Sequence, residues 1–310
     1  MIKVCSSYTL DDLPLETKVR VIALGLFDGL HQGHLDIIKK TVAIAQRDGL
    51  TSTVQTFRNL IKADGGSLYT SEEKLGLIGD TGSDEMLVLD FDSVRDMEPE
   101  QYLTDILLNR AIADTLVMGE DYRFGKGAKG DVALIKEFAS ANNIRVIVVK
   151  DRIFEGTDKK ISTTWLRQAL SEGDVDLARD LCGGRDYSYS GYCAHGKKLG
   201  REMGFPTVNI IVPEDKFVVR RGVYVSRVHL GRRVLYGVTN IGRRPTLEDA
   251  VNDVVETFIF DFDEDIYGAA VKVELLHFLR AEEHYSSKDE LIDAVNANKE
   301  QAREYLKNLN

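Results

Sequence analysis

A glycine-rich turn between an apolar run and an amphipathic segment is the feature that most constrains the fold of this chain. Residues 19–24 form an apolar run typical of a buried strand, and the turn Gly25–His34 follows it directly. Apolar residues then recur at helical spacing, at Leu35, Ile38, Val42 and Ala45. A strand that leads through a tight turn into a helix is typical of α/β proteins, which bind ligands at the carboxyl ends of their strands.

The turn reads Gly25-Leu26-Phe27-Asp28-Gly29-Leu30-His31-Gln32-Gly33-His34, and its residue types suit a phosphate site. Gly25 and Gly29 are expected to let the backbone turn sharply and approach a ligand. His31 and His34 are three residues apart, so in a first helical turn they would share a face. The N-terminus of the helix adds unpaired N–H groups and the positive end of the helix dipole. The alternative is a surface turn that only caps a helix.

Strand-like and helix-like segments alternate through residues 1–183. Further apolar runs occur at residues 53–57, 86–91, 115–118 and 144–149, and the helical stretches between them include 72–79, 99–111 and 131–142. This alternation predicts an α/β domain with a parallel sheet over residues 1–183.

The pattern changes near Gly183-Gly184, which predicts a second domain over residues 184–310. Short strand-like runs broken by turn residues follow, at 187–194, 222–230, 233–239, 254–261 and 270–278. They predict an antiparallel barrel or sandwich. Ser287-Lys288-Asp289-Glu290 is a capping-box sequence, and apolar residues at helical spacing after it predict a terminal helix.

The composition of the chain limits the kinds of partner and the compartment that we expect for it. The net charge of −10 over 310 residues argues against nucleic acid or an anionic membrane as the main partner. No apolar run reaches the length of a membrane span, and the N-terminal residues lack the apolar core of a signal peptide. The three cysteines, Cys5, Cys182 and Cys193, have no metal-ligand spacing, so we predict a cytoplasmic protein with reduced thiols. Whether the chain is a monomer or a homo-oligomer is left open.

Two more motifs in the first domain are expected to line the same cleft. Gly119–Gly127 follows the apolar run at 115–118 and offers Asp121 to a nucleotide and aromatic rings, including Phe124, to a planar group. Ser162, Thr163 and Arg167 stand at the start of a predicted helix, where hydroxyl groups and a guanidinium can bind phosphate. A glycine-rich surface turn and a simple helix cap are the respective alternatives.

The second domain carries a motif of its own at residues 196–209. Three glycines and three basic residues suit phosphate binding; they include Gly196, Lys198, Gly200 and Arg201. Thr207 and Asn209 are hard oxygen ligands that suit Mg²⁺ beside a nucleotide. Glu256 lies in a later strand-like run, where an exposed strand residue is the alternative to a catalytic one.

The His31-Gln32-Gly33-His34 tetrad resembles the His-x-Gly-His signature of the nucleotidyltransferase superfamily, and the whole chain resembles the prokaryotic bifunctional riboflavin kinase/FMN adenylyltransferase (FAD synthetase) family. The adenylyltransferase half is matched by the motifs at 25–34, 119–125 and 162–167. The kinase half is matched by the motifs at 196–209 and 240–246, by Glu256 and by Tyr267-Gly268. The resemblance implies a Rossmann-like parallel sheet followed by a riboflavin kinase-like six-stranded antiparallel barrel with a helical tail.

The resemblance also implies roles for single residues. In the first half, His31 and His34 would be catalytic and Phe124 would contact the flavin. ATP would be bound by Gly25, Phe27, Asp28, Gly33, Asp121, Ser162, Thr163 and Arg167. In the second half, Glu256 would take the proton of the ribityl 5′-hydroxyl and Arg280 would lie near the flavin. ATP would be bound by Gly196, Lys198, Gly200, Arg201, Thr207 and Asn209. Thr207 and Asn209 would also bind Mg²⁺. Riboflavin, FMN and ATP would be the substrates.

The chain departs from the family pattern in the adenylyltransferase half. The family usually has Pro-His-Pro after the second strand, where this chain has Arg58-Asn59-Leu60-Ile61, and it often has Asn at Leu26 and Arg at Trp165. Three other hypotheses therefore stand beside a two-activity enzyme. They are a kinase whose first domain has only a binding or structural role, an adenylyltransferase for another phosphate ester, and a flavin-binding regulator without enzymatic activity.

Overall fold

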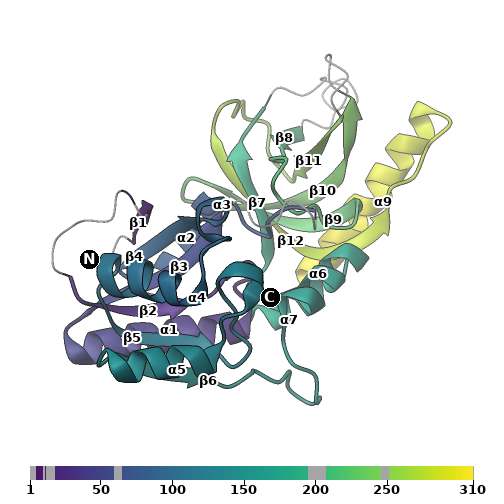
Figure 1. Ribbon diagram of the computed structural model, residues 1–310. Helices are drawn as coiled ribbons and strands as arrows, with labels where there is room; N and C mark the ends of the chain where they lie inside the picture. Colours follow the sequence, from purple (N-terminus) through teal and green to yellow (C-terminus); the bar gives the residue numbers. More distant parts are fainter. Residues whose placement is uncertain are drawn as a thin grey trace. The chain divides into compact units, whose positions relative to one another are not determined.

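The computed structural model describes residues 5–9, 11, 18–58, 65–194, 207–245 and 251–309. The chain divides into two compact units, residues 1–163 and 164–310, each built around its own sheet (Figure 1). Within the described ranges, no helix combines the length and the hydropathy that crossing a membrane requires.

The first unit contains a six-stranded parallel sheet. Its strands lie in the order β1-β4-β3-β2-β5-β6: β1 (Ser6–Thr9), β4 (Glu85–Asp90), β3 (Thr51–Arg58), β2 (Arg20–Leu24), β5 (Ala113–Gly119) and β6 (Arg145–Val149). The chain runs outward from β2 through β3 to β4, beside the edge strand β1, and then returns to β5 on the other side of β2. The order therefore reverses between β2 and β5, which is where open α/β sheets bind ligands.

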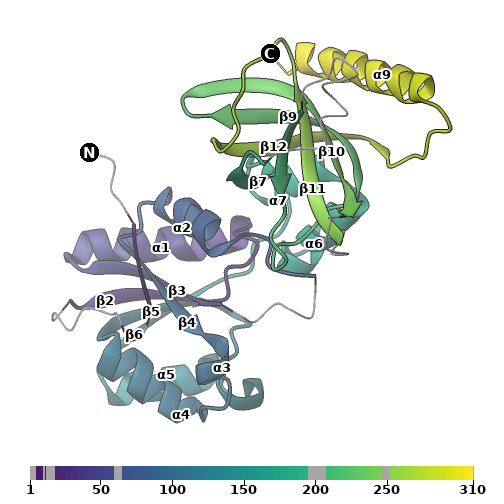
Figure 2. The same cartoon turned by 90° about the horizontal axis from the view of Figure 1, so that it is seen from above.

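Helices cover both faces of this sheet (Figure 2). One face carries α1 (Gln32–Asp48) and α2 (Ser71–Gly79); the other carries α4 (Pro99–Gln101), the π-helix Tyr102–Arg110 and α5 (Val132–Ala141). The short α3 (Phe91–Val94) follows β4 directly. The main apolar core of the second face joins side chains of β2, β4 and β5 to the π-helix and α5, among them Leu24, Leu89, Met118, Leu103 and Ile135.

A buried ion pair holds the amino ends of three neighbouring strands together. Arg20 of β2 is fully buried, and its Nε donates to Oε2 of Glu85 in β4 at 2.9 Å. Thr53 of β3, the strand between them, donates to the same oxygen at 3.1 Å. The opposite, carboxyl ends of these strands carry the loops of the candidate site.

The second unit is an antiparallel sheet curled into a barrel. Six strands lie in the order β7-β12-β9-β10-β11-β8: β7 (Tyr187–Tyr192), β12 (Ala270–Ala281), β9 (Gly222–Leu230), β10 (Arg233–Pro245), β11 (Val251–Ile259) and β8 (Thr207–Ile211). A bridge between Ala194, just after β7, and Asn209 of β8 joins the two outer strands, with N–H···O at 2.8 Å. This bridge brings the barrel close to full closure.

Among the described residues, three helices lie mainly in the second unit. The terminal helix α9 (Lys288–Lys307) packs on the outer face of the barrel, where Ala302 meets Val223, Val225 and Val238. Helices α6 (Thr163–Glu172) and α7 (Val175–Leu181) precede the barrel in sequence. Arg179 of α7 donates to the buried Asp186 carboxylate and to the Leu276 carbonyl oxygen, which ties α7 to the barrel.

The observed fold confirms the predicted classes, a parallel α/β unit followed by an antiparallel barrel with a terminal helix. The predicted cap of α9 is confirmed, because the Ser287 side chain accepts from the Glu290 N–H. The sequence did not predict β1 or β8. The division between the units at 163/164 lies twenty residues before the predicted boundary at 183/184, because the Arg179 bonds attach α7 to the barrel.

We expect a chain that starts at residue 164 to be more stable than one that starts at residue 184. The shorter chain loses the Arg179 bonds to Asp186 and Leu276, and one hydrogen bond to a charged group contributes about 1.5–3 kcal/mol. Urea unfolding of both chains measures the difference. Equal free energies of unfolding would show that α7 adds nothing to the barrel.

Candidate functional site

The turn between β2 and α1 reverses direction through two buried, left-handed residues. Phe27 has φ 49° and Leu30 has φ 44°, and both side chains are fully buried. The expectation that Gly25 and Gly29 supply the unusual backbone conformation is wrong, since neither has a positive φ. Gly25 is needed for space instead: a Cβ there would lie 2.9 Å from the Phe27 ring.

The two histidines of the turn stack on each other. His31 is the N-cap of α1, its Nδ1 accepts from the His34 N–H at 3.4 Å, and the ring centroids are 3.8 Å apart. The edge of Phe27 meets the His34 ring at 5.3 Å, and Nδ1 of His34 is buried without a hydrogen-bond partner among the described residues. Burial lowers the pKa of His34 well below its usual value, and electrostatic interactions with His31, Lys74 and Lys160 lower it further. His34 is therefore a neutral imidazole near pH 7.

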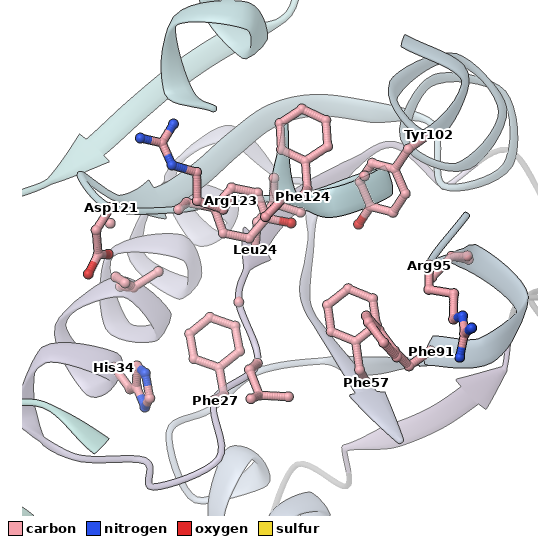
Figure 3. Close-up of a pocket in the computed structure, with 18 of the residues that line it drawn as sticks. Leu24, Phe27, His34, Phe57, Phe91, Arg95, Tyr102, Asp121, Arg123 and Phe124 are labelled. Carbon is pink, nitrogen blue, oxygen red and sulfur yellow. The ribbon is translucent and has the colours of Figure 1, made fainter. Parts of the chain in front are cut away.

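A cavity of about 590 Å³ opens beside these histidines at the carboxyl ends of β2, β3, β4 and β5 (Figure 3). His34 and Asp121 line one end. The rest of the wall is rich in aromatic rings: Phe27, Phe57, Phe91, Tyr102, Tyr122 and Phe124. Phosphate chemistry at one end and flat apolar surfaces at the other suit a ligand with a phosphate and a planar ring.

The predicted residues of the first unit fall into two groups. Gly25, Phe27, His34, Asp121 and Phe124 line the cavity, as predicted for the motifs at 25–34 and 119–127. Asp28 is buried and accepts from the Leu68 N–H at 2.9 Å, so in this structure its carboxylate holds the segment before α2. Gly33 lies beneath the His31 ring, where a Cβ would meet that ring at 3.3 Å.

The third predicted wall of the ATP site lies at the division of the chain. Ser162 precedes α6, and Thr163 is its first residue and the last of the first unit. Arg167 belongs to the second unit, where its guanidinium lies 5.0 Å from the Phe217 ring centroid. A role for these three residues in binding ATP remains a prediction.

Two lysines that the sequence did not single out lie close to the histidines. Lys160 donates to Asp121 at 2.6 Å and to Asp151 at 2.8 Å, and its place directly before the 161–167 motif was an available signal. Lys74 of α2 is only 5% exposed and contacts Leu26 and Thr56. Nothing in the sequence distinguishes it from an exposed helical lysine.

In the second unit the predicted residues lie on one level around the barrel. Asn209 of β8 pairs across the sheet with Glu256 of β11, and Glu256 pairs with Asn240 of β10. The row continues through Val223 of β9 to Arg280 of β12, beside a bulge. Val223 packs under α9, so this row lies on the outer face of the barrel.

Glu256 is tied to the candidate metal ligands. Oγ1 of Thr207 donates to Oε1 of Glu256 at 2.8 Å, and Nδ2 of Asn209 donates to the Thr207 carbonyl oxygen at 3.3 Å. Asn209 is nearly buried at 4% exposure. The predicted phosphate-binding residues Gly196, Lys198, Gly200 and Arg201 lie outside the described residues.

Arg280 stands three strands away from Glu256, roughly 14 Å along the sheet at the usual strand spacing. Its Nε donates to Oδ1 of Asn298 in α9 at 3.1 Å, and its guanidinium lies 5.7 Å from the Tyr285 ring. A substrate with a hydroxyl group at one end and a ring at the other fits such a span.

Comparison with known families decides between the hypotheses for the two candidate sites, one in each unit. A family model for FAD synthetase matches residues 14–165, and one for riboflavin kinase matches residues 183–306. A bifunctional riboflavin kinase/FMN adenylyltransferase of Bacillus subtilis is 32% identical over 93% of both chains. This chain belongs to the bifunctional riboflavin kinase/FMN adenylyltransferase family. The protein of that name from Escherichia coli K12 is 31% identical over 92% of both chains.

A solved structure shares the whole fold. The crystal structure of a Streptococcus pneumoniae protein titled a macrolide-efflux protein matches with a TM-score of 0.82 and 27% identity, covering 96% of this chain and 98% of that one. Its title describes that protein alone, and family membership here rests on the sequence matches to both halves.

We expect Gly25→Ala to lower FAD formation by about 10²-fold, because a displacement of about 1 Å in a catalytic arrangement can cost that much. The new Cβ would push the Phe27 ring away from His34. The assay is FAD formation from added FMN and ATP. Gly76→Ala is the matched control, since a Cβ in that helix meets no atom within 4 Å. Wild-type activity of Gly25→Ala would show that the packing of Phe27 does not matter for the reaction.

Proposed function

We propose that this chain phosphorylates riboflavin to FMN and then adenylylates FMN to FAD, with ATP as the phosphate donor in the first step and the nucleotide donor in the second. The observation that carries the proposal is that both family models match, each over a unit with its own candidate site. The first unit offers an aromatic cavity beside stacked histidines, and the second offers a carboxylate tied to candidate metal ligands.

In the adenylyl transfer, a phosphate oxygen of FMN attacks the α-phosphorus of ATP and pyrophosphate leaves. Negative charge grows on the oxygens around that phosphorus, and fixed donors aimed at them lower the barrier. The N-terminus of α1 and the imidazoles of His31 and His34 are such donors. Because His34 is neutral in the free protein, it serves as a hydrogen-bond donor, and the aromatic wall with Phe124 holds the isoalloxazine ring.

In the kinase reaction, the ribityl 5′-hydroxyl attacks the γ-phosphorus of ATP and ADP leaves. Glu256 accepts the proton of that hydroxyl as the oxygen–phosphorus bond forms. Its carboxylate is held by the Thr207 hydroxyl, which donates to one oxygen at 2.8 Å. Arg280, on the same level of the barrel, would meet the flavin end of the substrate.

The donor set beside Glu256 fits Mg²⁺. Thr207 offers a hydroxyl oxygen, and the Asn209 side chain, which donates through Nδ2, also carries an amide oxygen. Mg²⁺ prefers such hard oxygens and takes few protein ligands when nucleotide phosphates supply others. Bound there, the cation would neutralise charge on the ATP phosphates.

A kinase with an inactive first domain is the second hypothesis, motivated by the missing Pro-His-Pro sequence. Of the Arg58-Asn59-Leu60-Ile61 sequence that stands there, residues 59–61 lie outside the described residues. The match of the FAD synthetase model to residues 14–165 and the retained histidine pair favour two activities.

Exchanging residues in one unit should affect one activity alone. Glu256→Gln keeps the hydrogen bond to Thr207 but removes the base, so FMN formation should fall by about 10²–10⁴-fold while FAD formation from added FMN continues. Replacing His31 and His34 by Ala should lower FAD formation by about 10²–10³-fold and spare FMN formation. Chromatographic separation of the flavins measures both products.

Glu300→Gln, an exposed change on α9, is the control for the kinase assay. If Glu256→Gln retained full FMN formation, Glu256 would have only a structural role in its strand and would not be the base. If the histidine variant retained full FAD formation, the turn would not be the phosphate site.

A further inference from the structure

A buried lysine lies behind the turn that carries the histidines. Lys74 of α2 is 5% exposed, and its Nζ lies 3.4 Å from the Leu26 carbonyl oxygen and 3.3 Å from Thr56 Oγ1. Thr56 Oγ1 itself donates to the Leu26 carbonyl oxygen at 2.6 Å. Two donors from two different elements thus converge on one backbone carbonyl. Burying an ammonium group is costly, and burial lowers the pKa of Lys74, while the nearby Asp28 opposes that shift.

The carbonyl that these donors hold directly precedes the left-handed Phe27. A bulky residue in that conformation costs about 1–3 kcal/mol and persists only where its surroundings fix it. Leu26 is fixed by Lys74 and Thr56 before Phe27, and Asp28 is fixed by the Leu68 N–H after it. The ring of Phe27 then meets the edge of His34. The position of the His34 ring therefore depends on contacts that α2 makes.

Lys74 also acts on His34 through its charge. Four charged or titratable groups lie around His34. His31 stacks on it, and Lys74 lies behind the turn. Lys160 comes from the segment after β6 and is paired with the fourth group, the cavity-lining Asp121. Burial is the largest cause that lowers the pKa of His34, and electrostatic interactions with His31, Lys74 and Lys160 add to it. The lysine thereby helps to keep His34 neutral before ATP binds.

We propose that Lys74 is a positioning residue for adenylyl transfer: from α2 it fixes the Leu26 carbonyl, and through Phe27 it sets the place of His34. The inference rests on the proposed function of the first unit. It assigns no contact with substrate to Lys74, which does not line the cavity.

The test compares Lys74→Met, which removes the charge at similar length, with Lys74→Arg, which keeps it. FAD formation from FMN and ATP is followed from pH 5 to pH 9, and the His34 imidazole is titrated by NMR. We expect Lys74→Met to lower kcat by about 10–100-fold, with a smaller change in KM for FMN, because misplaced reacting groups reduce turnover. Loss of a positive neighbour should raise the pKa of His34 and move the acidic limb of the profile to higher pH. Lys74→Arg should retain the wild-type limb.

Thr56→Val separates geometry from charge and replaces Lys74→Met if that variant fails to fold. It removes one of the two donors to the Leu26 carbonyl and keeps the ammonium. We expect a lower kcat with an unchanged His34 pKa. Lys136→Met, an exposed lysine on α5, is the matched control, and the NMR spectrum recorded for the His34 titration reports folding of the first unit in every variant.

The outcomes separate the two proposals. If the wild-type chain forms no FAD, the proposed function of the first unit fails. If the wild-type chain forms FAD and both Lys74→Met and Thr56→Val match it in kcat, with the His34 pKa unchanged, Lys74 is not a positioning residue.

Discussion

The adenylyltransferase half depends on a turn that holds two bulky residues in a left-handed conformation. Phe27 and Leu30 are fully buried at φ 49° and 44°, a state that costs free energy for any residue but glycine. The contacts around the turn offset that cost: Lys74 and Thr56 hold the Leu26 carbonyl, and Asp28 holds the Leu68 N–H. The same turn delivers His31 to the N-cap of α1, so the proposed phosphate site depends on these contacts.

The kinase half positions its candidate residues in a different way. Its candidate residues lie on one level of the barrel because antiparallel register aligns Asn209, Glu256 and Asn240 across three strands. Backbone hydrogen bonds set their spacing, and no left-handed turn is involved in this row. The two units therefore show two ways to position polar groups for phosphate chemistry, one through a helix N-terminus and one through strand register.

Much of this could be predicted from the sequence because apolar periodicity reports burial. Strand β9 was predicted at its observed bounds, 222–230, and the cap of α9 at Ser287 followed from side-chain chemistry. Strand β8 was missed, since its five residues follow a glycine-rich motif that resembles a loop. The roles of Phe27 and Lys74 were missed for another reason: left-handed backbone is expected of glycine, and a helical lysine is expected in solvent. Only tertiary contacts reverse those expectations.

The most direct test follows the products of the intact chain over time with riboflavin, ATP and Mg²⁺. Two activities on one chain predict that FMN rises first and then falls as FAD appears. ADP should match the riboflavin consumed, and pyrophosphate should match the FAD formed, because each transfer releases its own leaving group. FMN that accumulates to completion, with neither FAD nor pyrophosphate, would contradict the account and leave a kinase alone.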